Sequence, residues 1–283
     1  MKLFILFALF LKGQLWASPL IIYGEDNRVD VHQSKKPLLK KLADSTAAMI
    51  SKDYLINENN QVQIKAPLFK NVYKLCQSER FRDQLAAANC SGTLIEKDII
   101  LTAGYCYSNS MDCKGYSWVF DYRASSEKQS QVSVPNSSVY RCKEILAIKD
   151  DRKTNIDYAL IRLDRKVVGR APVDIRLVGE VSYKDKLAVI GHPRGLPTKI
   201  ADSGDVLELF SDSIRSNLDA YTMNSGSGVF NEKTGDLEGI LISGKSDFEL
   251  DDSGCLKSQR LSNTEGDEMI TKIQTIWPLI DLF

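Results

Sequence analysis

Short apolar runs alternate with polar turns along most of the chain after about residue 61. Runs of this length, bounded by Gly, Asn, Asp or Ser, are typical of β-strands. The chain shows no heptad repeat and no long amphipathic helical pattern. The pattern therefore predicts an all-β fold, a sandwich or a barrel. The expected strands are 92–95, 98–103, 117–122, 139–148, 157–163, 186–191, 205–210 and a pair within 228–244 joined by a hairpin turn.

The two flanks of this region differ from it. Residues 18–60 are polar and rich in Lys, and we interpret them as an N-terminal extension or pro-segment. Within them, Pro37 precedes apolar residues at helical spacing, which predicts a short helix. Residues 56–61, Ile-Asn-Glu-Asn-Asn-Gln, predict a turn. Residues 269–280 predict a strand followed by a short terminal helix that Pro278 disturbs.

The first 17 residues have the composition of a secretory signal peptide. Lys2 precedes an apolar run over residues 3–11, and the small residue Ala17 stands before a polar one. The run is too short to span a bilayer. We expect cleavage after Ala17 and a secreted or periplasmic protein with no stable membrane anchor; the alternatives are a buried N-terminal strand or an uncleaved anchor.

The number of cysteines is consistent with export to an oxidising compartment. Six cysteines form an even set, and an exported chain with such a set is expected to form disulfides. A zinc site is the alternative, but the sequence has no Cys-x-x-Cys pair, and its two histidines, His32 and His192, lie far apart. We expect no metal and no cofactor. The 37 basic residues balance 37 acidic ones, which gives no support for nucleic acid as a partner.

Three motifs then appear in order: CSGTLIEKDIILTAGYC over 90–106, NIDYALIRL over 155–163 and MNSGSGVF over 223–230. Together they resemble the trypsin-like serine peptidases, and the last is closer to the bacterial glutamyl-endopeptidase branch. The resemblance covers most of residues 60–283. It implies two six-stranded antiparallel β-barrels, the first over 61–170 and the second over 171–283, with the catalytic site in the cleft between them.

The resemblance gives each motif a role. Ser225 takes the position of the nucleophile, and Asp157 takes that of the acid that orients a catalytic imidazole. From the residues alone, Asp157 could also be a surface residue at a strand entrance, and the serine motif a flexible turn; Ser227 is a second candidate nucleophile. The resemblance also implies a disulfide between Cys90 and Cys106. The partners of Cys76, Cys113, Cys142 and Cys255 stay open.

The position of the catalytic base holds Tyr105. A phenol with a pKa of about 10 is ionised in about one molecule in a thousand at pH 7. The neutral phenol is a poor proton acceptor and cannot form the cation that Asp157 would stabilise. Loss of the His from such a triad lowers turnover about a millionfold in a protease of related geometry, which is about 8 kcal/mol of barrier.

The oxyanion loop departs from the family in the same direction. Family members have Gly two residues before the nucleophile, where its backbone N–H and that of Ser225 form the oxyanion hole; this chain has Met223. A residue with a Cβ avoids backbone angles that Gly adopts, and losing one oxyanion donor lowers the rate about 10²–10³-fold. Gly228 replaces a Pro usual in the branch. Asn224 replaces the Asp that pairs with a new N-terminus in trypsin-like zymogens, so we expect no activation by that route.

The resemblance also places two residues in substrate binding. Asp219, six residues before Ser225, takes the position that selects Lys or Arg in trypsin; a solvated turn is its alternative. Gly244 takes the position at a strand edge that pairs with an extended peptide. His192 is expected at the edge of the second barrel and His32 in the extension, and we predict that neither replaces the missing base.

These inferences lead to one favoured function and two alternatives. The favoured one is an exported trypsin-like serine peptidase homologue, catalytically impaired or inactive, that retains a cleft for an extended peptide or protein ligand. The second is an active serine endopeptidase that uses Ser225 with an unusual base. The third is an interaction protein that uses another surface and keeps the cleft as a relic.

Overall fold

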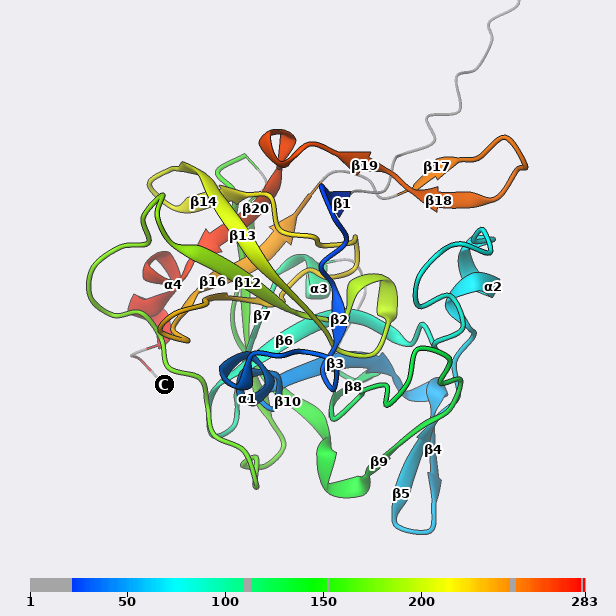
Figure 1. Cartoon of the computed structure of the whole chain (residues 1–283). Helices are drawn as coiled ribbons and strands as arrows, with labels where there is room; N and C mark the ends of the chain where they lie inside the picture. The colour runs from blue at the N-terminus through cyan, green and yellow to red at the C-terminus, as the bar shows by residue number, and fades with distance from the viewer. Residues whose placement is uncertain (1–21, 109–112, 152, 245–247, 281, 283) are drawn as a thin grey trace, which may run out of the picture.

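A computed structural model describes residues 22–108, 113–151, 153–244, 248–280 and 282. The predicted signal peptide, residues 1–17, lies outside the described residues. Two β-barrels make up most of the rest, which confirms the all-β prediction and the two-barrel architecture (Figure 1).

The first barrel is a closed ring of antiparallel strands. Around the ring they are β10 (Val139–Asp151), β11 (Ile156–Leu163), β7 (Ile99–Thr102), β6 (Ala88–Glu96), β3 (Thr46–Ser51) and β8 (Tyr116–Phe120). Gly92 on β6 leaves room for the side chains of Ile100 and Trp118 in the interior of this barrel. A Cβ there would lie 2.4 Å from Ile100 Cγ2 and 2.7 Å from Trp118 Cζ3.

The second barrel is also antiparallel. Around the ring its strands are β12 (Lys186–Gly191), β15 (Gly228–Asn231), β16 (Leu237–Ser243), β20 (Glu268–Lys272), β14 (Ser213–Ser216) and β13 (Lys199–Leu209). It closes because its first and second strands in chain order, β12 and β13, pair with each other. The short strand β2 (Val29–Asp30) from the N-terminal region pairs with β13. The hairpin turn predicted between residues 231 and 239 joins β15 to β16 and is confirmed.

The continuous apolar runs of the sequence belong to strands that are covered on both faces. Successive side chains of a strand point to opposite sides. On β11, Ala159 and Ile161 lie in the core of the first barrel, whereas Tyr158 and Leu160 lie in an apolar cluster between the barrels. That cluster also takes residues from β12, β15, β16, α1 (Pro37–Ala43) and α4 (Ile273–Ile280). It fixes the two barrels against each other and so fixes the cleft.

Residues 18–60 were expected to be an extension, and their described part is instead built into the fold. β3 lies within this segment and pairs with β6 and β8, so the first barrel begins before residue 61. The sequence of β3, Thr-Ala-Ala-Met-Ile-Ser, is rich in Ala and follows a helical pattern directly. Because Ala is not a strong strand former, nothing in this run marked it as a strand.

The predicted local elements within the flanks are confirmed. A helix, α1, begins at Pro37 and buries Leu39, Leu42 and Ala43. The turn over 56–61 joins β4 (Leu55–Glu58) to β5 (Gln61–Ile64), which pairs with β9 (Val132–Pro135). At the other end, β20 runs directly into α4, which contains Pro278.

The remaining elements are short. The segments β1 (Ile22–Tyr23) and β19 (Arg260–Leu261) pair in parallel, and β17 (Phe248–Leu250) and β18 (Leu256–Ser258) form a hairpin. The helical ones are α2 (Phe69–Tyr73), α3 (Tyr105–Ser108) and the 3₁₀ turns η1 (Lys52–Tyr54), η2 (Asn136–Ser138), η3 (Pro193–Gly195) and η4 (Asn263–Glu265).

Three disulfides cross-link the fold. The predicted bond between Cys90 and Cys106 is confirmed and ties the start of α3 to β6. The other pairs, left open by the sequence, are Cys76–Cys255 and Cys113–Cys142. None of the described helices has the length and apolar character needed to cross a membrane.

Candidate active site

Tyr105 and Asp157 meet at one wall of the cleft between the barrels. Tyr105 is the first residue of α3, and its backbone N–H donates a 3.0 Å hydrogen bond to Asp157 Oδ1. Asp157 on β11 is buried, and its own N–H donates to Thr271 Oγ1 of the second barrel over 3.2 Å. The Tyr105 side chain is 38% exposed. The carboxylate that the sequence predicted as a triad acid thus accepts the backbone N–H of the residue at the predicted position of the base.

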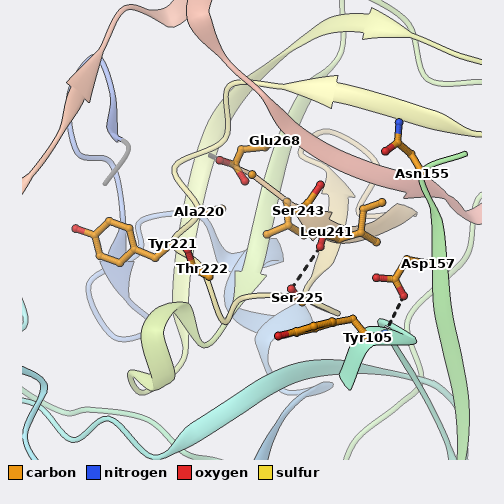
Figure 2. Close-up of a pocket in the computed structure, with 12 residues that line it drawn as sticks. Tyr105, Asn155, Asp157, Ala220, Tyr221, Thr222, Ser225, Leu241, Ser243 and Glu268 are labelled. Atoms are coloured by element: carbon orange, nitrogen blue, oxygen red, sulfur yellow. Dashed lines mark hydrogen bonds between the residues drawn. The ribbon is translucent and has the colours of Figure 1, made fainter. Parts of the chain in front are cut away.

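Ser225 lies in the loop that leads into β15 and lines the same cavity as these two residues (Figure 2). Its carbonyl accepts a 3.0 Å hydrogen bond from the N–H of Ser91, which anchors the loop to β6. Its Oγ donates to the carbonyl of Ile242 over 3.5 Å. The next residue must be Gly, since Gly226 has φ +83° and a Cβ there would lie 2.2 Å from Thr102 Oγ1.

Met223 adopts a left-handed backbone conformation, which Gly adopts more readily than a residue with a Cβ. Its φ is +64°, in the left-handed region that costs a residue with a Cβ about 1–2 kcal/mol. Tyr73 Oη lies 3.3 Å from Met223 Sδ and helps to hold the side chain aside. In the described part of the chain, no acceptor bonds the N–H of Met223 or of Ser225. The substitution therefore strains the loop without tying up the two donors expected of an oxyanion hole.

These residues share one cavity of about 300 Å³. Tyr105, Asp157, Ser225 and Gly244 all line it, so the structure brings together four residues that the sequence placed in the site. The lining also contains residues that sequence reasoning missed: Asn155, Ala220, Tyr221, Thr222, Leu241, Ile242, Ser243 and Glu268. Glu268 is the most consequential of these, because it adds a carboxylate to the wall opposite Asp157 (Figure 2).

Asp219 is placed differently from the expectation. It is 2% exposed and is not among the described residues that line the cavity. Its carboxylate accepts the backbone N–H groups of Tyr23 and Asn27 over 2.8 and 3.1 Å. Burial raises the pKa of Asp219 to about 6, against the opposing effect of the nearby Arg28 guanidinium. Asp219 therefore fastens the N-terminal segment to the second barrel and is not part of the described lining of the cavity.

The sequence could not show this because the competing residues lie almost 200 positions away. Arg28 is fully buried behind the cavity wall, where its guanidinium lies 3.5 Å from the ring centroid of Tyr221. It pairs with Asp26 through two hydrogen bonds of 2.7 and 2.8 Å. Burial alone would raise the pKa of Asp26, but this pairing lowers it to about 2.

Both histidines are bonded away from the nucleophile. His192 is completely buried; its Nδ1 lies 3.3 Å from Ser91 Oγ and its Nε2 lies 3.1 Å from Thr198 Oγ1. Burial, aided by Lys199 and Arg123, lowers the pKa of His192 to about 3. His32 Nδ1 lies 3.0 Å from the carbonyl oxygen of Ala124.

The second candidate nucleophile is also occupied. Ser227 is fully buried, and its Oγ donates a 2.7 Å hydrogen bond to Asn224 Oδ1. Asn224 is thus a structural residue of the loop. Between the two serines, Ser225 is the one that lines the cavity.

Comparisons with known proteins agree with this architecture. The sequence pattern of the trypsin-like peptidase domain matches residues 90–240, which is more than half of the chain and contains all three motifs. A search of curated proteins finds no match.

Among solved structures, the chain resembles a Glu endopeptidase determined in complex with MPD, with a TM-score of 0.55 and 15% identity, covering 92% of this chain and 97% of that one. It also resembles a serine endoprotease from Yersinia pestis, with a TM-score of 0.51 and 11% identity, covering 87% of this chain and 64% of that one. At these identities the likeness concerns the fold. Through the sequence match, the chain belongs to the family of trypsin-like peptidase domains.

Proposed function

We propose that this protein is an exported trypsin-like serine peptidase homologue, catalytically impaired or inactive, that binds extended peptides in its cleft. The observation that carries the proposal is the contact between Tyr105 and Asp157. The carboxylate that would orient an imidazole accepts the backbone N–H of a tyrosine, and both histidines of the chain are bonded elsewhere.

Proton transfer is the step that this arrangement does not support. The Ser225 hydroxyl must lose its proton to become nucleophilic, and a general base works best when its pKa lies near the operating pH. The hydrogen bond from Ser225 Oγ goes to the carbonyl of Ile242, which is not a base at neutral pH. The lost base alone corresponds to about a millionfold in turnover.

The alternative of an active enzyme with His192 as base finds no support in this geometry. His192 would have to leave Ser91 and Thr198 and the buried space that holds it. Its ring also stacks on that of Tyr122, with centroids 5.9 Å apart. A group with a pKa of about 3 is a weak base at neutral pH even where it can reach a proton.

The cleft itself supports ligand binding. Ser243 and Gly244, at the end of β16, are exposed and line the cavity beside Ser225. An exposed strand end offers backbone N–H and C=O groups to an extended peptide, which adds as a further strand. Export is supported by the composition of residues 1–17 and by three disulfides, which are typical of oxidising compartments.

Two measurements on the same samples test the proposal. The first compares turnover of extended peptides with Lys, Arg or Glu before the scissile bond by the native protein and by Ser225→Ala. We expect equal, background-level rates. Turnover that disappears in Ser225→Ala would contradict the loss of catalysis.

The second measurement is binding of the same peptides. We expect both proteins to bind them and Gly244→Val to bind at least ten times more weakly, because a Cβ at this position would lie 2.1 Å from Glu268 Oε2. Gly169→Ala is the control, since a Cβ there meets nothing within 4 Å. If no peptide binds, the cleft is a relic and this part of the proposal is wrong.

A further inference from the structure

The cavity beside Ser225 has a carboxylate in the wall opposite the triad acid. Glu268 is the first residue of β20 and lines the cavity although it is only 1% exposed. Its carboxylate lies against the backbone of Gly244, where a Cβ would be 2.1 and 2.3 Å from the two oxygens. The hydroxyl of Tyr23 lies 3.5 Å from Glu268 Oε1. The side chain is thus held in one place by packing from two sides.

The charged residues among the described lining of the cavity have one sign. Asp157 and Glu268 contribute carboxylates, and no Lys, Arg or His occurs among the described residues that line it. The charged residues buried behind the cavity wall do not reverse this sign. Arg28 carries one positive charge there, whereas Asp26 and Asp219 carry one negative charge each when ionised. A charged side chain that enters the cavity therefore meets a negative field in a partly dehydrated space, where charge interactions are stronger than in water.

The rest of the wall suits the stem of a long basic side chain. Ala220, Leu241 and Ile242 contribute apolar residues to the lining of the cavity that holds Ser225 and Glu268. Lys and Arg side chains place their methylene groups on such surface and direct the charged end to a polar partner. An acidic side chain would bring a third carboxylate beside two others, and like charges at close range oppose binding.

We infer that Glu268 is the specificity-determining residue of this cavity and that it selects a Lys or Arg side chain of the bound peptide. The inference rests on the proposed function of the cleft as a peptide-binding site. It assigns to Glu268 the selection that the sequence alone assigned to Asp219, whose carboxylate instead accepts the N–H groups of Tyr23 and Asn27.

Two small probes of the same shape test the inference without a peptide. Benzamidine is a cation at pH 7.5, and benzamide is its neutral analogue. By calorimetry, we expect the native protein to bind benzamidine at least ten times more tightly than benzamide. Glu268→Gln keeps the shape of the side chain and should reduce this ratio to below two. Glu249→Gln removes the same charge from the exposed β17 hairpin, where Glu249 pairs with Lys257, and should keep the native ratio.

The inference is wrong if the native protein does not distinguish the probes, or if Glu268→Gln keeps the native ratio. If Glu268→Gln does not fold, as judged by its melting temperature, the decision falls to the native protein and a set of peptides that differ in one residue. Binding of the Lys and Arg peptides at least ten times more tightly than the Glu and Ala peptides supports the inference. Equal binding of all four peptides, or tighter binding of the Glu peptide, overturns it and leaves the proposed function intact. Absence of any peptide binding, with benzamidine still preferred over benzamide, contradicts the proposed function alone.

Discussion

The backbone N–H of Tyr105 donates a 3.0 Å hydrogen bond to Asp157 Oδ1, so the carboxylate predicted as a triad acid is retained beside a residue that offers no imidazole. The same contact explains why the loop keeps its position without the imidazole. The hydrogen bond from the backbone and the disulfide from the adjacent Cys106 to Cys90 hold the start of α3 whatever side chain stands at position 105. The backbone around the predicted position of the base is therefore held in place, and under the proposed function only the base itself is missing.

Restoring the base should therefore restore reactivity in part. We expect Tyr105→His to react slowly with a serine-directed phosphonate and the double variant Tyr105→His/Met223→Gly to react at least ten times faster. Gly accepts a φ near +64° without strain, which lets the oxyanion loop adjust around a developing charge. Labelling is measured by intact-protein mass spectrometry. Adding Ser225→Ala to the double variant is the control, and labelling that survives this change would not come from the active site.

The close approach at Gly226 gives a stability prediction with a matched control. Gly226 and Gly169 have similar positive φ angles, +83° and +77°, so Ala at either position meets similar backbone strain. At Gly226 the Cβ would also lie 2.2 Å from Thr102 Oγ1 and 2.3 Å from the Ser91 carbonyl oxygen, whereas at Gly169 it meets nothing within 4 Å. We expect Gly169→Ala to lower the unfolding free energy by about 1 kcal/mol and Gly226→Ala by about 3 kcal/mol or more. Urea denaturation of the two variants measures this difference; equal losses would show that the loop moves aside at little cost.

A buried ion pair connects the N-terminal segment to the second barrel. Lys199 Nζ lies 2.6 Å from Asp30 Oδ1 and 2.8 Å from Gln84 Oε1, and both charged side chains are almost fully buried. Removing one partner leaves an uncompensated buried charge, so we expect Lys199→Met to lower the unfolding free energy by about 3–5 kcal/mol. Lys186 pairs with Asp205 on the surface, and Lys186→Met should change the unfolding free energy by about 1 kcal/mol or less.

The ion pair also predicts how a second substitution behaves. In the variant Lys199→Met/Asp30→Asn the uncompensated charge is gone, so stability should recover by at least about 1 kcal/mol relative to Lys199→Met alone. Additive losses from the two substitutions would mean that the pair contributes through packing and not through charge.

The sequence predicted the elements that are determined by residues close together in the chain, such as turns and short helices. The turn between β4 and β5 has φ angles of +49° and +63° at Asn59 and Asn60, a conformation that Asn tolerates better than most residues. The α1 helix was predicted from Pro37 at its start and from the helical spacing of its apolar residues. In the site, the three family motifs contribute Tyr105, Asp157 and Ser225, and all three line one cavity.

What the sequence did not predict depends on contacts between distant segments. Asp219 had the expected position in the chain, but Tyr23 and Asn27 occupy its carboxylate from a segment interpreted as an extension. Glu268 belongs to no motif, and it enters the cavity because the pairing of β20 with β14 and β16 brings its strand to the edge of the cleft. Such residues become visible only when the register of the sheet is known.

The burial of His192 leads to a dependence of stability on pH. Its pKa is about 3 in the folded protein, because burial and the charges of Lys199 and Arg123 disfavour the cation, whereas an unfolded His has a pKa of about 6.5. Between these values the unfolded chain binds more protons, so this residue makes the protein less stable as the pH falls below 6.5, at up to about 1.4 kcal/mol per pH unit. Asp219, whose pKa burial raises to about 6, acts in the opposite sense as the pH falls from 6 to 4. A variant is therefore needed to separate the two residues.

His192→Gln keeps a polar side chain between Ser91 and Thr198 and does not titrate. We expect the native protein to be more stable than this variant at pH 7.5, and the difference between them to shrink by about 2 kcal/mol on going to pH 5, since only the native protein loses stability through His192. The contribution of Asp219 is the same in both proteins and cancels in the difference. Urea denaturation with the disulfides intact gives the two free energies at each pH. A difference that stays constant from pH 7.5 to 5 would mean that His192 takes up its proton equally in the folded and unfolded chains, which its complete burial and its bonds to Ser91 and Thr198 do not allow.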